Sequence, residues 1–212
     1  MVGRTILGQF AISHPLWDNA FGAAYLAGLS PLITRDICRF ATEGSTAADE
    51  LAHSGLVASA TATTRAALRS YGLPERRFAI AQHLPSRATR AVVRALGRGE
   101  QPASEADVLL VGAPIWRLGL RQAAALQCRV VVALGPVRLA NGVEELLDER
   151  KIVILPEALV AGGRLLGLHL VEQGMQAPEA MLHVAALAEA KTDELFRRFP
   201  GGPLVGESRD FV

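Results

Sequence analysis

Short apolar runs alternate with segments of helical periodicity along the middle of this chain. The runs are rich in β-branched residues and lack polar alternation, which is typical of strands buried on both faces of a parallel sheet. The pattern predicts strands at residues 78–82, 108–111, 130–134 and 152–155. Helical spacing surrounds them at residues 59–70, 86–97, 117–127, 140–149 and 164–199, the last broken near Gly174 and Pro178. This order predicts an α/β fold with a mainly parallel sheet covered by helices.

The predicted α/β domain extends from residue 56 to residue 199. Residues 1–55 contain apolar positions compatible with short helices, but they are too few for an independent substrate domain. We expect this mostly helical extension to pack on the core or to form an oligomer contact. Residues 200–212 include Gly-Gly-Pro, and we expect them to form a flexible, loosely packed tail.

Composition and charge exclude several classes of function. Half of the 212 residues are apolar, yet no run approaches the roughly 18 consecutive apolar residues of a membrane span. The first thirty residues lack the order of a signal peptide, so we expect a cytoplasmic protein without a membrane partner. The net charge is +1, so no overall positive field attracts nucleic acid, and we expect no nucleic-acid partner.

No metal site or familiar hydrolase motif is evident in the sequence. The cysteines, Cys38 and Cys128, are ninety residues apart and form no Cys-x-x-Cys pair, so reduced thiols are expected. There is no metal-ligand spacing, no Gly-x-Ser-x-Gly elbow and no phosphate-binding lysine loop. We therefore expect neither a metal nor a serine hydrolase site.

Several segments resemble, in the same order, the cofactor domain of the Glu/Leu/Phe/Val dehydrogenase family. The similar segments are residues 60–68 (its opening helix), 80–82 (the strand before its glycine turn), 106–111 and 128–135 (two later strands), and 145–157 with 161–163 (its last-strand motif, one residue short). The resemblance covers about residues 56–199. It implies a Rossmann-like, doubly wound fold, here in a reduced form, with nicotinamide dinucleotide at the carboxyl ends of the strands and oxidative deamination of amino acids.

The chain departs from this family where the family binds its cofactor. The first two turn glycines fall at His83 and Pro85, and only Ala88 keeps a small residue. Pro85 also lacks the N–H that would help to hold a phosphate. The polar linker 97–104 leads directly to the next strand, so we expect the strand with the ribose-binding acid to be deleted. Two later asparagines of the family fall at Val137 and Val160.

The amine chemistry of the family is also unsupported by this sequence. The resemblance implies substrate-binding and water-activating lysines in an N-terminal domain, but the only lysines are Lys151 and Lys191. We therefore interpret the chain as a truncated, divergent relative that has lost dinucleotide binding, so that no cofactor is expected.

Candidate chemistry lies at the strand ends, where open α/β sheets bind ligands. His83 and Glu157 are candidate acid/base groups, although His83 can equally fill the vacated nucleotide space and Glu157 can simply hold its turn. Trp116 offers a flat apolar wall. The further candidates for substrate binding are Gln82, Arg87 and His169. Arg87 begins a stripe with Arg90, Arg94 and Arg98 that suits an anion or a partner's carboxylates, or is a solvated helix face.

Three functions remain open. The first is a repurposed, cofactor-independent enzyme of isomerase, cyclase or lyase type that acts on a small molecule. The second is a non-catalytic, homodimeric scaffold or regulatory pseudoenzyme, which the high apolar content favours. The third is a residual NAD(P)-dependent oxidoreductase. The first two agree with the expected loss of the phosphate-binding turn.

Overall fold

A four-stranded parallel sheet forms the centre of the computed structural model, which describes residues 46–72, 80–84, 86–97, 106–112, 115–200 and 202–205. Its strands are β1 (Ile80–His83), β2 (Val108–Val111), β4 (Val130–Ala133) and β6 (Val153–Ile154), in the order β1-β2-β4-β6. Ile80 pairs with Val108, and Val108 with Val130. All residues of β2 and β4 are buried, so the predicted parallel sheet is confirmed.

The first strand ends one residue later than predicted. The sequence places the strand at 78–82 and His83 in the turn, whereas His83 pairs with Val111 as the last residue of β1. The His83 carbonyl also accepts a hydrogen bond from the N–H of Gly112, 3.2 Å away. This bond extends the ladder past the predicted end and delays the turn.

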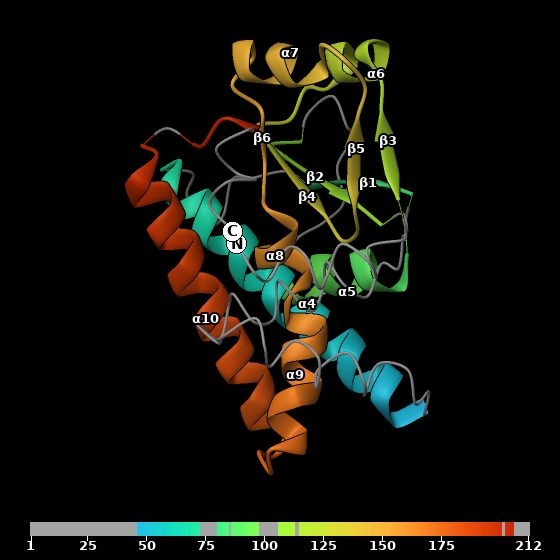
Figure 1. The fold of residues 1–212 in the computed structure, drawn as a ribbon, viewed down its shortest axis with the longest axis vertical. Coiled ribbons are helices and arrows are strands. Elements are labelled where there is room, and N and C mark those ends of the chain that lie inside the picture. The colour runs from blue at the N-terminus through green and yellow to red at the C-terminus, as the bar shows by residue number, and fades with distance from the viewer. Residues whose placement is uncertain are drawn as a thin grey trace, which may run out of the picture.

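A second, two-stranded parallel sheet was not predicted. β3 (Trp116–Leu118) pairs with β5 (Val137–Leu139) beside the main sheet (Figure 1). The predicted helices at 117–127 and 140–149 therefore begin later than expected, as α6 (Leu120–Ala125) and α7 (Val143–Glu149). The reason is the local burial of β3, where exposed Arg117 separates two buried residues in the period-two pattern of a strand.

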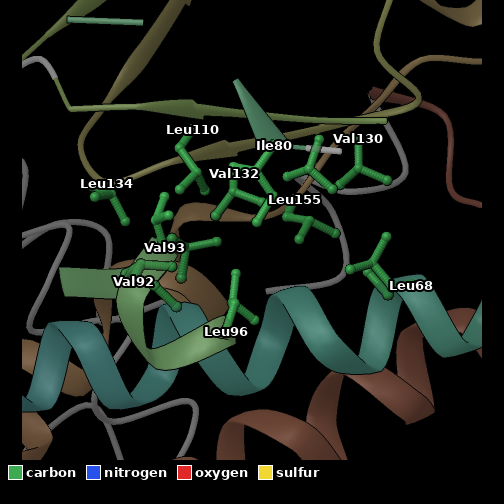
Figure 2. Close-up of a cluster of buried hydrophobic side chains, with 14 of the residues drawn as sticks. Leu68, Ile80, Val92, Val93, Leu96, Leu110, Val130, Val132, Leu134 and Leu155 are labelled. Atoms are coloured by element: carbon green, nitrogen blue, oxygen red, sulfur yellow. The ribbon is translucent and has the colours of Figure 1, made fainter. Parts of the chain in front are cut away.

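One long helix, α4 (Thr46–Ser70), lies under the main sheet together with α5 (Arg87–Leu96) (Figure 1). Helical structure therefore begins before residue 59, and the boundary expected at residue 55 falls inside α4. Residues 1–45, most of the expected N-terminal extension, lie outside the described residues. Figure 2 shows the core between these helices and the sheet, where Leu68 and Val92 face Leu110 and Val132.

Three helices follow the last strand. They are α8 (Glu157–Ala161), α9 (Gly163–Glu172) and α10 (Ala177–Arg198). The predicted break is confirmed, because Gly174 has a φ of 95° and Pro178 lies in the first turn of α10. Both long helices pack along α4, so the lower half of the molecule in Figure 1 is a helical layer.

Helices α4 and α9 meet backbone to backbone at glycines. A Cβ atom on Gly163 would lie 2.6 Å from the Cβ of Ser59, and closer still to the carbonyl oxygen of Gly55. The Ser59 hydroxyl lies at the same crossing and donates to the carbonyl of Val160 at 2.7 Å. Only a residue without a side chain fits at this point, so Gly163 at the start of α9 and Gly55 on α4 together fix the approach of the two helices.

The other face of the sheet carries a second core under α6 and α7. It includes Trp116, Leu147 and, from the end of the chain, Val205, which is 4 % exposed. The N–H of Val205 donates to the Asp148 carboxylate at 2.9 Å. Val205 is thus packed in the second core and bonded to α7, while most of the tail predicted to be loose, residues 206–212, lies outside the described residues.

Among the described helices, none is both long enough and apolar enough to cross a membrane.

Candidate functional site

The turn after β1 closes on itself through a capping box. Ser86 is the N-cap of α5, and its hydroxyl accepts a hydrogen bond from the N–H of Thr89 at 3.2 Å. In return, the N–H of Ser86 donates to the hydroxyl of Thr89 at 2.7 Å. Thr89 is fully buried beneath this turn. Side chains of the protein therefore already occupy an amide of the helix N-terminus, where a dinucleotide-binding turn offers free N–H groups to phosphate.

The same turn packs directly against the end of β2. A Cβ atom on Gly112 would lie 2.6 Å from the Ser86 hydroxyl and 2.7 Å from the Leu84 carbonyl oxygen. Leu84 has a φ of 55°, a left-handed conformation that glycine adopts more readily. Leu84 and Ser86 thus pack directly against Gly112, which leaves no room for a side chain at that position.

His83 and Trp116 come together at the carboxyl end of the sheet. Their ring centroids are 5.9 Å apart, with an angle of 55° between the ring planes. The indole is 5 % exposed and belongs to the second core, whereas the imidazole is exposed. Trp116 therefore packs against the His83 ring, while the imidazole remains exposed to solvent.

The sheet order separates His83 from Glu157. Glu157 begins α8 just after β6, and β2 and β4 lie between β6 and β1. At a spacing of about 4.8 Å per strand, the two side chains start roughly 14 Å apart. They do not form the direct acid/base pair considered from the sequence. They can flank a ligand that lies across the strand ends, with partly buried Gln82 on the His83 side.

An ion pair joins α4 to the start of α5 at the rim of this region. The Arg87 guanidinium donates two hydrogen bonds to the Glu50 carboxylate, at 2.8 and 2.6 Å. The hydrogen bonds from Arg87 lower the pKa of Glu50. Arg87, predicted as a ligand contact, is therefore already engaged within the protein.

His53 lies one turn after Glu50 on α4 and is partly buried. Burial lowers the pKa of His53, and the positive charges of Arg87 and Arg164 lower it further, while Glu50 opposes the shift. The lowered pKa favours the neutral form of the imidazole.

Arg164 lies in the first turn of α9, and the residue is partly buried. Burial lowers the pKa of Arg164, while Glu157 opposes this shift through its charge. The hydrogen bonds and ion pairs of the described residues include none made by this guanidinium.

The remaining predicted residues are dispersed. His169 is partly buried on α9, and its Nδ1 atom has no hydrogen-bond partner. Arg90 and Arg94 are exposed on α5, as expected for a solvated helix face, and Arg98 lies outside the described residues. Within the described ranges, no group of three or more potential ligands is placed to hold a metal ion.

Sequence reasoning missed His53, Glu50 and Arg164. The spacing of Glu50 and His53, three residues apart, marks one helix face, but the sequence does not place α4 beside α5 and α9. Arg164 directly follows Gly163, and nothing in the sequence indicates that this glycine packs against α4.

The comparisons with known proteins agree with this architecture. No protein-family model and no curated protein matches the sequence. Among solved structures, the L-tryptophan dehydrogenase from Nostoc punctiforme is similar, with a TM-score of 0.58 over 74 % of this chain and 13 % sequence identity. The chain spans 58 % of the length of that protein. At this identity the similarity establishes the fold alone: the chain has a dehydrogenase-like, Rossmann-like α/β fold.

Proposed function

We propose that this chain is a repurposed dehydrogenase-like protein that has lost dinucleotide binding and amine redox chemistry. It acts without a nucleotide cofactor on a small molecule bound at the carboxyl ends of the strands. The reaction belongs to the isomerase, cyclase or lyase type, because His83 and Glu157 supply proton transfer but no route for electrons.

The observation that carries this proposal is the self-capped turn after β1. Dinucleotide-binding turns hold the pyrophosphate with free N–H groups at a helix N-terminus, approached closely through glycines. Here Ser86 accepts from the N–H of Thr89, and Ser86 and Leu84 lie against Gly112. A diphosphate would have to displace this capping box, which is worth about 1 kcal/mol in helix stability.

Calorimetric titration with NAD and NADP tests the loss of dinucleotide binding. We expect no saturable heat with either nucleotide, while a known NAD-dependent dehydrogenase titrated in parallel binds normally. The variant Ser86→Ala, which frees the Thr89 amide, serves as a second sample and should remain without binding because Pro85 still lacks an N–H. A micromolar dissociation constant for the unaltered chain would refute the proposal and favour a residual oxidoreductase.

Turnover measurements test the proposed catalytic roles of His83 and Glu157. Small metabolites that raise the melting temperature are incubated with the protein, and their conversion is followed by proton NMR. His83→Ala and Glu157→Gln should each lower turnover by roughly a hundredfold or more. His183→Ala is the matched control, because this histidine is exposed on α10 away from the strand ends. Unchanged turnover in both test variants would remove the assignment.

A dimeric scaffold is the second candidate, and the surface of α10 favours it. Leu182 is 73 % exposed, beside an open, mainly apolar groove of about 520 Å³ between α4, α5 and α10. Exposed apolar surface of this kind commonly marks a protein contact. Light scattering should then give the mass of a dimer, and Leu182→Glu should give that of a monomer. A monomer at micromolar concentration would exclude this candidate.

A further inference from the structure

The groove between α4, α5 and α10 lies in the helical layer of the molecule (Figure 1). Its volume of about 520 Å³ falls within the range of roughly 300–1,000 Å³ that is typical of small-molecule sites. Along α4 its lining extends from His53 to Arg65, roughly 18 Å at the rise of an α-helix. The lining includes none of His83, Trp116 and Glu157, so a ligand in this groove is separate from the substrate proposed for the strand ends.

The walls of the groove are mainly apolar. Val57 and Ala58 contribute from α4, and Met181, Leu182 and Ala185 contribute from α10. The two alanines leave room that larger side chains would fill, and the flexible methionine adapts to ligands of different shape. Leu182 is mostly exposed at the edge of the groove. An elongated apolar molecule therefore gains affinity here by removing this surface from water.

One buried hydroxyl in this lining has no hydrogen-bond partner. Thr61 is 8 % exposed, and its Oγ1 atom is unpaired among the described residues. The other three buried hydroxyls of α4, those of Ser59, Thr63 and Thr64, each donate to a backbone carbonyl. A buried hydroxyl without a partner is unfavourable. Because Thr61 lines the groove and threonine adopts two rotamers in helices, a turn about χ1 presents this hydroxyl to a ligand.

Arg65 lies one helical turn after Thr61, on the same face of α4. Its guanidinium donates to the carbonyl of Ala95 at 2.7 Å, and this bond holds it between α4 and α5, where both residues line the groove. Among the described residues, no carboxylate forms an ion pair with Arg65. Glu189 also lines the groove, but its charge is already paired with Arg69 at 2.7 Å. One positive charge is therefore available to a ligand, beside the unpaired hydroxyl.

We propose that this groove binds an apolar monocarboxylate, a molecule with an elongated hydrocarbon body and one carboxylate. The carboxylate accepts hydrogen bonds from the Arg65 guanidinium and the Thr61 hydroxyl, and the hydrocarbon body lies against Met181 and Leu182. A single guanidinium balances one negative charge, which favours a carboxylate over a phosphate dianion. This binding function is additional to the chemistry proposed at the strand ends and does not depend on it.

Calorimetric titration with sodium octanoate at pH 8 tests the site, with sodium acetate and 1-octanol as comparisons. We expect saturable binding of octanoate, no binding of acetate, which lacks the hydrocarbon body, and about tenfold weaker binding of 1-octanol, which lacks the charge. From hexanoate to octanoate the affinity should rise by roughly fourfold for each added methylene, because the groove buries it. No saturable binding of octanoate, or equal affinity for 1-octanol, would overturn the proposal.

Three variants make the test specific. Arg65→Met keeps an apolar stem but removes the charge, and should bind octanoate about tenfold more weakly. Thr61→Val keeps the shape but removes the hydroxyl, so it should raise the melting temperature of the free chain and weaken octanoate binding by about fivefold. Arg90→Met, exposed on α5 and outside the lining, should bind like the unaltered chain. Undiminished affinity in both Arg65→Met and Thr61→Val would refute the assignment.

A second copy of the chain is the competing occupant of this groove, because Leu182 is also the contact residue of the dimer considered above. Light scattering on the titrated samples separates the two occupants. One octanoate bound per chain, with the mass of the protein unchanged, supports the ligand site. A fall in mass from dimer to monomer as octanoate binds would show that the second copy fills the groove, and would refute the proposal.

Discussion

The crossing of α4 and α9 makes a strong prediction about Gly163. Replacement by alanine adds one methyl group where the Gly55 carbonyl and the Ser59 side chain already touch the glycine. The nearest carbon, the Cβ of Ser59, would be 2.6 Å away, whereas carbons in favourable contact are about 3.5–4.0 Å apart. No side-chain rotation relieves this overlap, because the obstacles are backbone and the first atom of a side chain.

The cost of Gly163→Ala can be worked from these contacts. The helices must separate by roughly 1 Å, and overpacking of this kind costs about 1–3 kcal/mol. The movement also weakens the bond from Ser59 to the Val160 carbonyl, worth about 1 kcal/mol. The higher helix propensity of alanine offsets up to about 1 kcal/mol of this loss in the free energy of unfolding. We therefore expect the free energy of unfolding to fall by about 2 kcal/mol.

Gly167 on the same helix provides the matched control. A Cβ atom there would meet only the terminal methyl of Met181, at 2.8 Å, and the Cα of Gly55, at an ordinary 3.5 Å. Since a methionine end moves easily, Gly167→Ala should be neutral or stabilise by up to about 1 kcal/mol. Urea unfolding followed by circular dichroism measures both variants. A loss below about 0.5 kcal/mol for Gly163→Ala, or equal losses for both, would refute the proposed crossing.

Three further predictions concern single residues. Lys151 follows α7 with a left-handed φ of 54°, so Lys151→Gly should raise the free energy of unfolding, measured by urea titration, by about 1 kcal/mol. The control Lys191→Gly, inside α10, should lower the free energy of unfolding by a similar amount. Because the pKa of His53 is lowered in the folded chain, the unfolded chain binds the proton more readily, and the free energy of unfolding should decline as the pH falls below about 6.5. His53→Gln should flatten this decline in melting curves recorded between pH 5 and 8. Identical curves for the variant and the unaltered chain would contradict the shift. Burial raises the pKa of Cys128 to about 11, so in a Cys38→Ser background the native protein should resist thiol reagents at pH 8 and react only when unfolded.

The main sheet could be predicted because its strands are buried on both faces. Residues 108–111 form β2 as expected, since a run of β-branched and leucine residues fits a central parallel strand and little else. β3 and β5 were missed because three residues are too few to show a period. Their pairing continues through hydrogen bonds from the Trp116 N–H to the Pro136 carbonyl and from the Ala140 N–H to the Leu118 carbonyl, contacts that only the tertiary structure brings together.

The sequence allowed us to predict only those residues of the candidate site that lie at the ends of strands. The rule that strand ends gather ligands located His83 and Trp116, which do come together. It could not locate His53 or Arg164, because they lie on α4 and α9, helices whose packing depends on the Gly55–Gly163 contact. Residues of this kind become visible only once the helix crossings are known.

The anchoring of Val205 has a consequence for synthesis on the ribosome. The core under α7 needs Val205, whereas the other buried members of this cluster, from Ala106 to Ile154, are synthesised well before it. Protein chains emerge residue by residue, and this apolar surface therefore stays partly uncovered until Val205 has also emerged. A nascent chain stalled before Val205 has emerged should remain sensitive to protease around α7, and a chain stalled after Val205 has emerged should be protected there.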